Sequence, residues 1–390
     1  MDDGAPRRQG GVFVRWALSG EPVARLRLAP EAGLAELRAG VLIHLDRGCT
    51  LQFLHEGRAL LGSQPLTEQG VTDGATVDVV RSGPHLALTA SADGTAKVWL
   101  AERGECIRTL EGHDAQLCSA AFSPDGRFVI TASMDRTAKI WHLDGGECER
   151  TLALHHGPVL SAAFSPDGQS VVTASGDFTA RLWRREDSTC HATLEGHGGP
   201  VGTACFSPDG KLVATTSMDR TARLWMAASG IWVCLLDGHT GAVTSASFSH
   251  DGQLLVTASA DGTAMIWSRE GHRMRTLACA GFPRNQVRHA SFSPDGGQVI
   301  AALADGTARI WKVDSGECVL ALQGHSKEAY CAAFSPCGHL AITSSLDGTA
   351  KLWSIDVEDC VMTLYGHSGP VWSAALRLES GPGDPPCHAA

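Results

Sequence analysis

The 390-residue sequence has few charged residues, an excess of acids over bases, and no long apolar run. Charged side chains make up 19% of it and the formal net charge is -10, so it lacks the basic surface that nucleic acids and anionic membranes attract. Nowhere do membrane-length apolar residues follow one another, and the first ten residues contain no apolar leader segment. We therefore expect an intracellular protein, cytoplasmic rather than nuclear because it has no basic cluster, that binds proteins or peptides and neither nucleic acid nor membrane.

The sequence also lacks the common motifs of catalysis, cofactor binding and metal binding. It contains no CxxC pair, GxSxG elbow, P-loop or HExxH. Its 13 cysteines are an odd number, which favours reduced thiols over a disulfide framework. We expect no enzyme activity, no cofactor, no metal and no small-molecule substrate.

What the sequence does contain is a long internal repeat. Seven tryptophans recur at intervals of 42 residues, with a single interval of 44, and an aspartate stands six residues before each of them. The tryptophans are Trp99, Trp141, Trp183, Trp225, Trp267, Trp311 and Trp353. The aspartates are Asp93, Asp135, Asp177, Asp219, Asp261, Asp305 and Asp347. Apolar and small residues alternate between SPDG-like and ADGT-like turns, which predicts four short strands in each repeat.

This pattern resembles the WD40 repeat from residue 85 to residue 378. Glycine-histidine pairs such as Gly112-His113 precede most first strands, with Leu154-His155 as a variant. The resemblance implies a seven-bladed β-propeller in which a histidine, a strand serine, the turn aspartate and the tryptophan form a hydrogen-bonded tetrad. By position, the tetrads are His113, Ser133, Asp135 and Trp141; His197, Ser217, Asp219 and Trp225; His239, Ser259, Asp261 and Trp267; His325, Ser345, Asp347 and Trp353; and His367, Ser91, Asp93 and Trp99. Because the set recurs, we interpret it as structural and not as a nucleophilic triad.

The two ends of the repeat region complement each other. Trp99 is preceded by a second-type strand from His85 but by no first strand, whereas the chain ends with an extra first-type strand, Val371 to Leu378. We predict that these segments pair, so that one blade is composed of residues 85–110 and 371–378. The propeller would then occupy residues 83–380, followed by a disordered tail at 381–390.

Residues 11–82 follow a different pattern, after a tail at 1–10 that we expect to be disordered. VFVRWALSGEPVARLRL predicts a hairpin, GLAELRAGVLIHL a helix, and LQFLHEGRALL and ATVDVV strands. This segment is similar to the small α+β ubiquitin-like (β-grasp) fold. The fold class predicted for the chain is therefore mainly β, a propeller preceded by a ubiquitin-like domain. The resemblance maps ubiquitin's apolar patch onto Leu18, Leu54 and Val80, although three surface aliphatic residues are also ordinary in any domain.

Proteins of the family that the repeat resembles bind partners on the face formed by the histidine loops and the ADGT-like turns. At one equivalent position, three consecutive repeats have Arg288, Tyr330 and Trp372, and such side chains are enriched at binding hot spots. We predict a protein-binding surface here; the alternative is that Tyr330 and Trp372 only pack on neighbouring blades. Further apolar residues expected around it are Met134, Leu160, Met218 and Leu346.

The repeat before Trp311 departs from the others. It has no glycine-histidine pair, Leu303 replaces the serine, and its loop from Ala280 to Val287 has two extra residues. Replacing both hydrogen-bonding partners by apolar groups has almost no effect on stability, which favours a neutral change of sequence without a functional role. The alternative is a loop freed to contact a partner.

Together these features predict a non-catalytic scaffold, monomeric within a larger complex, that binds one protein on the propeller and a second partner on the ubiquitin-like domain. Two alternative functions remain open. One is a ribosome-assembly factor similar to the Notchless family, which would be nuclear. The other is a substrate adaptor of the ubiquitin pathway, although no repeat has the arginine expected three residues after a blade tryptophan in cullin-bound receptors.

Overall fold

The computed structural model describes residues 12–16, 22–26, 32, 37, 50–55, 58–60, 65–72, 75–82, 85–278 and 285–378. The chain divides into two compact units, Met1–Pro84 and His85–Ala390.

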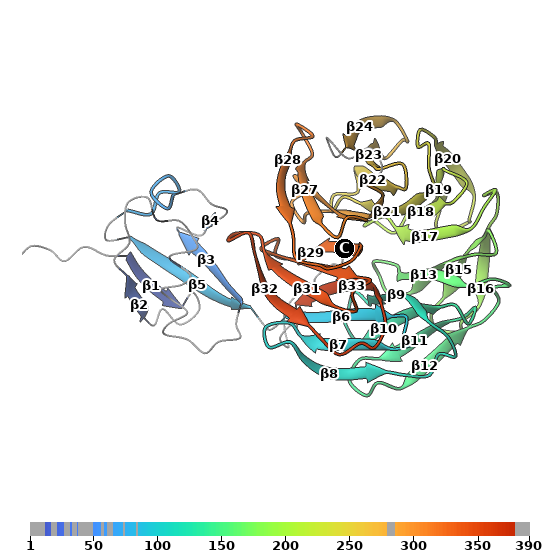
Figure 1. The fold of residues 1–390 in the computed structure, drawn as a ribbon, viewed down its shortest axis with the longest axis horizontal. Coiled ribbons are helices and arrows are strands. Elements are labelled where there is room, and N and C mark those ends of the chain that lie inside the picture. The colour runs from blue at the N-terminus through green and yellow to red at the C-terminus, as the bar shows by residue number, and fades with distance from the viewer. Residues whose placement is uncertain are drawn as a thin grey trace, which may run out of the picture. The chain divides into compact units, whose positions relative to one another are not determined.

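The first unit contains one mixed sheet in the order β2-β1-β5-β3-β4 (Figure 1). Strand β1 runs parallel to β5, and the other neighbouring pairs are antiparallel. Its core contains Val14, Leu37, Phe53 and Val77, all of them fully buried. The expected helix lies outside the described residues, apart from Leu37. The five strands are β1 (Val12–Trp16), β2 (Pro22–Leu26), β3 (Thr50–His55), β4 (Arg58–Ala59) and β5 (Thr76–Ser82).

The described part of the second unit consists of seven sheets, each with four antiparallel strands. The first sheet joins the two ends of the unit and contains β33 (Val371–Leu378), β6 (His85–Ser91), β7 (Ala96–Leu100) and β8 (Glu105–Leu110). The next three are β9 (Leu117–Phe122), β10 (Phe128–Ser133), β11 (Ala138–His142) and β12 (Cys148–Leu152); β13 (Val159–Phe164), β14 (Ser170–Ser175), β15 (Ala180–Arg184) and β16 (Cys190–Leu194); and β17 (Val201–Phe206), β18 (Leu212–Ser217), β19 (Ala222–Met226) and β20 (Trp232–Leu236). The last three are β21 (Val243–Phe248), β22 (Leu254–Ser259), β23 (Thr263–Ser268) and β24 (Arg273–Ala278); β25 (Val287–Phe292), β26 (Gln298–Leu303), β27 (Ala308–Lys312) and β28 (Cys318–Leu322); and β29 (Ala329–Phe334), β30 (Leu340–Ser345), β31 (Ala350–Ser354) and β32 (Asp359–Leu364). The prediction of a mainly β chain made of repeated four-stranded units is confirmed.

The sheets pack face to face through their tryptophans. Trp183 of the third sheet, for example, lies in one buried cluster with Ile130 and Ile140 of the second. Second strands are covered on both faces, and every residue of β10 is buried. This burial explains why the second strands consist of small and aliphatic residues without a polar alternation.

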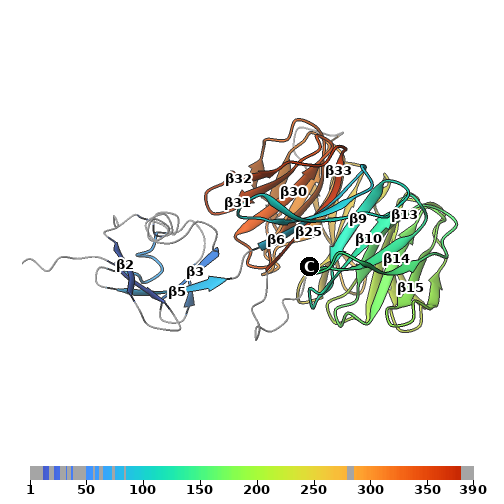
Figure 2. The ribbon, with the colours of Figure 1, turned by 90° about the horizontal axis from the view of Figure 1, so that it is seen from below.

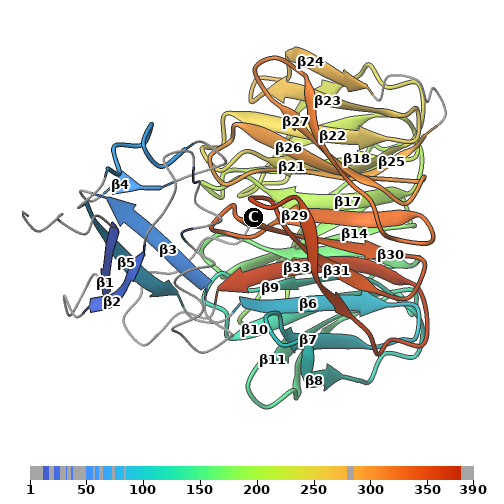
Figure 3. The same cartoon turned by 60° about the vertical axis from the view of Figure 1, so that its left-hand side comes forward.

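The seven sheets form a ring (Figures 1 and 2). The first strand of each sheet lies beside the first strand of the next, in the order β9, β13, β17, β21, β25, β29, β33 and back to β9. Between the last and first sheets, Trp99 packs with Ile342, Leu352 and Leu376. Strand β33 pairs antiparallel with β6 over its whole length, with Val371 opposite Ser91 and Leu378 opposite His85 (Figure 3). The two ends of the unit are thus joined through one sheet.

Candidate functional site

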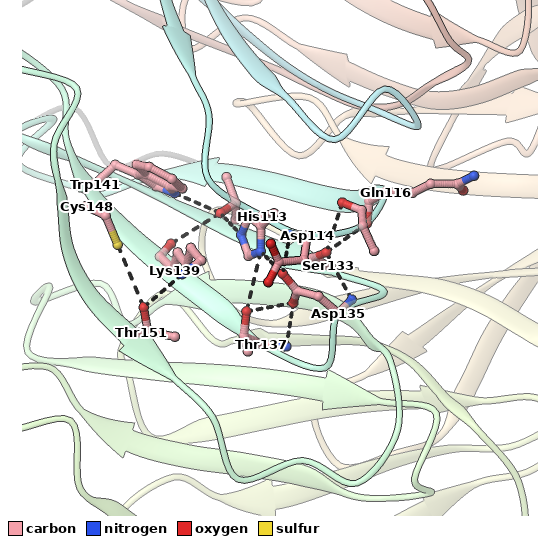
Figure 4. A network of polar contacts seen from close by, with 12 residues as sticks. His113, Asp114, Gln116, Ser133, Asp135, Thr137, Lys139, Trp141, Cys148 and Thr151 are labelled. Carbon is pink, nitrogen blue, oxygen red and sulfur yellow. Dashed lines mark hydrogen bonds and ion pairs between the residues drawn. The ribbon is translucent and has the colours of Figure 1, made fainter.

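A chain of hydrogen bonds connects the second and third strands of most sheets to the loop before the first strand, and Figure 4 shows the one in the second sheet. In the second sheet, Trp141 Nε1 donates to Thr131 Oγ1 over 2.8 Å, and Thr131 Oγ1 lies 2.8 Å from His113 Nε2. His113 Nδ1 in turn lies 2.6 Å from Asp135 Oδ2. Each chain therefore links a strand tryptophan to a turn aspartate through a threonine and a histidine.

The same chain is present in five other sheets. The threonines at its centre are Thr89, Thr173, Thr215, Thr257 and Thr343. The predicted histidines, aspartates and tryptophans all take part: His197, Asp219 and Trp225; His239, Asp261 and Trp267; His325, Asp347 and Trp353; and His367, Asp93 and Trp99. A sixth complete chain, outside the predicted tetrads, uses His155, Thr173, Asp177 and Trp183.

The predicted serines are not the hydroxyl groups of these chains, and this part of the prediction is wrong. Ser133 Oγ donates to the carbonyl of Gln116 over 3.0 Å and accepts the backbone N–H of Asp135 over 3.1 Å, so it stabilises the turn instead. Side chains two residues apart on a strand face the same side, and six of the seven second strands have a threonine two residues before their serine. The same correction applies to Ser91, Ser217, Ser259 and Ser345.

The hydrogen bonds fit a neutral histidine. Thr131 Oγ1 accepts from the indole, so its own proton is available for the lone pair of His113 Nε2, while His113 Nδ1–H donates to Asp135. Burial lowers the pKa of His113, against the opposing effect of Asp135, and so favours this neutral form. Burial alone would raise the pKa of Asp135, but hydrogen bonds from Thr137 and His113 outweigh it and lower that pKa. The set is a structural network with the charge held on the aspartate.

The divergent sheet replaces the histidine by an asparagine. Asn285 Nδ2 donates to Asp305 Oδ2 over 2.5 Å, and Asn285 Oδ1 accepts the backbone N–H of Asp305 over 3.0 Å. Leu303 is fully buried, as expected for an apolar replacement of the turn serine. Residues 279–284 of the preceding loop lie outside the described residues. The sequence did not indicate Asn285, because it lies 20 residues before Asp305, whereas each histidine lies 22 residues before its aspartate.

Three half-buried side chains on adjacent first strands form a second cluster. Tyr330 on β29 and Trp372 on β33 pack edge to face, with ring centroids 4.6 Å apart. The guanidinium carbon of Arg288 on β25 lies 5.6 Å from the centre of the Tyr330 ring. Arg288 Nη2 is 2.7 Å from Glu328 Oε2, an ion pair that sequence reasoning missed. The structure therefore brings Arg288, Tyr330 and Trp372 together.

Of the other predicted binding residues, Leu346 belongs to the sheet of Tyr330, and Met134, Leu160 and Met218 lie on three other sheets. Met134 and Met218, which follow β10 and β18, are 43% and 59% exposed. Leu160 on β13 and Leu346 after β30 are half-buried. In the N-terminal unit, Leu18 lies outside the described residues, and Leu54 and Val80 belong to β3 and β5 with side chains that the structure does not describe.

Two features are absent from the described part of the chain. Its histidines, cysteines and acids form no group of three or more that could hold a metal ion. Within the same residues, no helix has the length and apolar character needed to cross a bilayer.

Comparison with known proteins agrees with this architecture. The family model for the WD domain, G-beta repeat, matches residues 104–142, 146–184, 188–226, 231–268, 273–312 and 316–354. The chain is 45% identical over 49 residues to nuclear distribution protein PAC1 of Arthroderma benhamiae, which covers 13% of this chain and 11% of that protein. It is 46% identical over 43 residues to the F-box-like/WD repeat-containing protein TBL1X of Mus musculus, which covers 11% of this chain and 8% of that protein. The chain thus matches about a tenth of the length of these curated relatives. The six matched repeats span more than half of the chain, which belongs to the WD40 repeat family.

Proposed function

We propose that this chain is a non-catalytic scaffold that binds a protein or peptide at the cluster of Arg288, Tyr330 and Trp372. WD40 repeat proteins generally act as platforms for protein interactions. The observation that carries the proposal is the side-by-side placement of one arginine and two aromatic rings on three adjacent first strands. Arginine and large aromatic residues contribute most of the energy of many interfaces.

The geometry suits a peptide with an apolar side chain beside an acidic one. The Tyr330 and Trp372 rings provide a rigid apolar contact, which loses little conformational entropy when a partner binds. Arg288 is already fixed by Glu328 and by the Tyr330 ring, so a partner carboxylate meets an ordered cation. Such prior ordering favours affinity.

The platform in this proposal is a closed seven-bladed propeller. Its support is the set of seven four-stranded sheets and the contact of β33 with both β9 and β29. Closure removes the exposed sheet edges that otherwise promote aggregation. A rigid ring holds the three binding residues at constant spacing.

The N-terminal unit would be a ubiquitin-like domain that binds a second partner. The sheet order β2-β1-β5-β3, with β1 and β5 parallel in its centre, supports this assignment. With one partner on each unit, the chain would act as an adaptor.

Alanine substitution at all three cluster positions tests the binding site. We expect the triple variant R288A/Y330A/W372A to lose at least about 30-fold in affinity for peptides selected against the wild-type chain, since hot-spot residues contribute about 2 kcal/mol or more. Trp232→Ala is the matched control, because Trp232 is an exposed aromatic residue on the outer strand β20. If the triple variant folds, and both its selected peptides and the proteins it captures from cells equal those of the wild type, the proposed site is wrong.

A further inference from the structure

The turn between β29 and β30 contains a cysteine at a position where its sister turns have a carboxylate. Five equivalent turns have an aspartate: Asp125, Asp167, Asp209, Asp251 and Asp295. In each of them, one carboxylate oxygen of the aspartate accepts two hydrogen bonds. One comes from the hydroxyl of the serine two residues before the aspartate, and the other from the backbone N–H two residues after it. In the sixth turn, Ser335 to Gly338, this position is Cys337.

The sulfur of Cys337 occupies the place of the carboxylate oxygen. Ser335 Oγ lies 3.2 Å from Cys337 Sγ, and the backbone N–H of His339 also donates to the sulfur. In three of these turns the pKa of the aspartate is lowered. Burial alone would raise the pKa of Asp209, for example, but hydrogen bonds from Ser207 and Arg269 outweigh it and hold that pKa at about 2. A turn built around an anion favours the thiolate over the thiol.

A cation from the next sheet completes the arrangement. Arg269 Nη2 lies 2.7 Å from Asp209 Oδ2, although these residues belong to neighbouring sheets. His85, at the start of β6 in the first sheet, has Nε2 3.6 Å from the Cys337 sulfur. The Cys337–His85 pair therefore crosses from the last sheet to the first as a thiol counterpart of the Asp209–Arg269 ion pair.

Glu102 orients the imidazole of His85. Its Oε1 accepts the backbone N–H of His85 over 2.6 Å and lies 3.1 Å from His85 Nδ1. With Nδ1–H directed to Glu102, Nε2 faces the sulfur, and the carboxylate stabilises the positive imidazolium. Cysteine, histidine and acid thus have the arrangement by which proteins activate a thiol.

Burial alone would lower the pKa of His85, but its hydrogen bonds to Cys337 and Glu102 outweigh that effect and raise the pKa to about 9. Burial alone would raise the pKa of Cys337, but the hydrogen bonds from His85 and Ser335 lower it to about 6. His85 is completely buried, whereas Cys337 is only half-buried. The cation is shielded from water, while the cysteine is partly exposed.

We propose that Cys337 is a reactive thiolate, paired with the imidazolium of His85, and that peroxides oxidise it selectively to a sulfenic acid. The sulfur attacks one peroxide oxygen, an S–O bond forms and the O–O bond breaks. Sulfur loses two electrons, which reduce the peroxide, and the departing hydroxide takes a proton from His85 Nε2 to leave as water. A low-molecular-weight thiol then condenses with the sulfenic acid to a mixed disulfide, with loss of water. A second such thiol attacks that disulfide, which releases the Cys337 thiolate and leaves the two small thiols joined as their own disulfide.

The other cysteines among the described residues lack this combination. Cys106, Cys148 and Cys318 are exposed, but their sulfurs contact backbone carbonyl groups of their own strands. Cys331, although near His289, is buried. Burial raises the pKa of Cys118 to about 12. The exposed outer-strand thiols therefore serve as internal references.

Labelling of the full chain with limiting iodoacetamide at pH 6.5, followed by peptide mass spectrometry, tests the proposal. We expect Cys337 to react about five-fold faster than Cys148, because its larger thiolate fraction exceeds the loss of nucleophilicity that accompanies a lower pKa. Its labelling rate should also reach a plateau at lower pH than that of Cys148. Dilute hydrogen peroxide followed by dimedone should mark Cys337 first.

Two variants separate reactivity from folding. Cys337→Asp restores the residue of the sister turns and should keep the melting temperature while removing the label. His85→Gln should slow labelling of Cys337 to the rate of Cys148. A wild-type chain in which Cys337 reacts no faster than Cys148, or a folded His85→Gln variant in which Cys337 keeps its fast rate, would overturn the proposal. If His85→Gln does not fold, the wild-type pH profile decides, and equal plateau positions for Cys337 and Cys148 contradict it.

Discussion

At the residue scale, the threonine on the second strand of six sheets is the centre of the hydrogen-bond chain. Thr131 Oγ1 satisfies both the buried indole N–H of Trp141 and the Nε2 of His113. A buried polar group that loses its partner costs about 1–3 kcal/mol. One hydroxyl group therefore provides the hydrogen-bonding partner of two buried groups. In this way it connects the second strand with the third strand and with the loop before the first strand.

Replacing Thr131 by valine keeps the shape and removes the hydroxyl. We expect the variant to lose about 2–4 kcal/mol in free energy of unfolding, because two buried groups lose their partner. Denaturant titration measures this loss, and the indole N–H resonance of Trp141 should shift.

Ser133→Ala is the matched variant on the same strand. It removes the bond to Asp135 N and loosens the turn, but the Trp141 indole resonance should stay unchanged. An indole shift in Ser133→Ala and none in Thr131→Val would restore the serine tetrad and contradict the corrected assignment.

The sequence predicted the histidine, aspartate and tryptophan of five of the six chains because their spacing repeats. It could not separate Thr131 from Ser133, since both lie on one face of a strand and only the register of the strand with the loop decides between them. The pairing of Cys337 with His85 could not be predicted for a different reason. Its partner His85 is 252 positions away, and the ring alone brings them together.

At the element scale, the SPDG turns need a glycine in the left-handed region. Gly126 and Gly168 have φ of 65° and 69°. A Cβ on Gly168 would meet only Pro124 at 3.9 Å, whereas a Cβ on Gly126 would lie 1.3 Å from the guanidinium of Arg377. Arg377, on the last strand, donates to the Gly126 carbonyl over 2.7 Å. The first of these turns therefore also holds the end of the repeat region.

Alanine at the two glycines separates backbone strain from this contact. We expect Gly168→Ala to cost about 1–2 kcal/mol through its positive φ alone. Gly126→Ala should cost more, because it also displaces Arg377, and denaturant midpoints compare the two variants directly. Equal losses would show that the Arg377 contact adds nothing to stability.

Strand positions followed from the alternation of the sequence, and the pairing of the first sheet from the missing and surplus strands at the two ends. The N-terminal unit was harder to predict. Its strands β1, β3 and β5 have recognisable apolar patterns, but the segment is not repeated, so these patterns cannot be compared with equivalent copies in the chain. Repetition is what made the rest of the chain easy to interpret.

At the scale of the whole molecule, stability depends on how the two ends of the ring meet. Strand β33 contributes the buried residues Val371, Ala374 and Leu376 and pairs with β6 from the other end of the unit. His367 brings the hydrogen-bond chain of Asp93 and Trp99 across the same junction. Without this strand, the first sheet would expose the edge of β6 and lose its network.

Thermal unfolding of a chain that lacks residues 366–390 tests this closure most directly. Burial of Val371 and Leu376 alone is worth about 3–6 kcal/mol, so we predict a melting temperature lower by about 10 °C or more, or a chain that does not fold. Removing only residues 381–390 should leave the melting temperature unchanged. A chain without residues 366–390 that melts at the temperature of the full chain would contradict the closed ring.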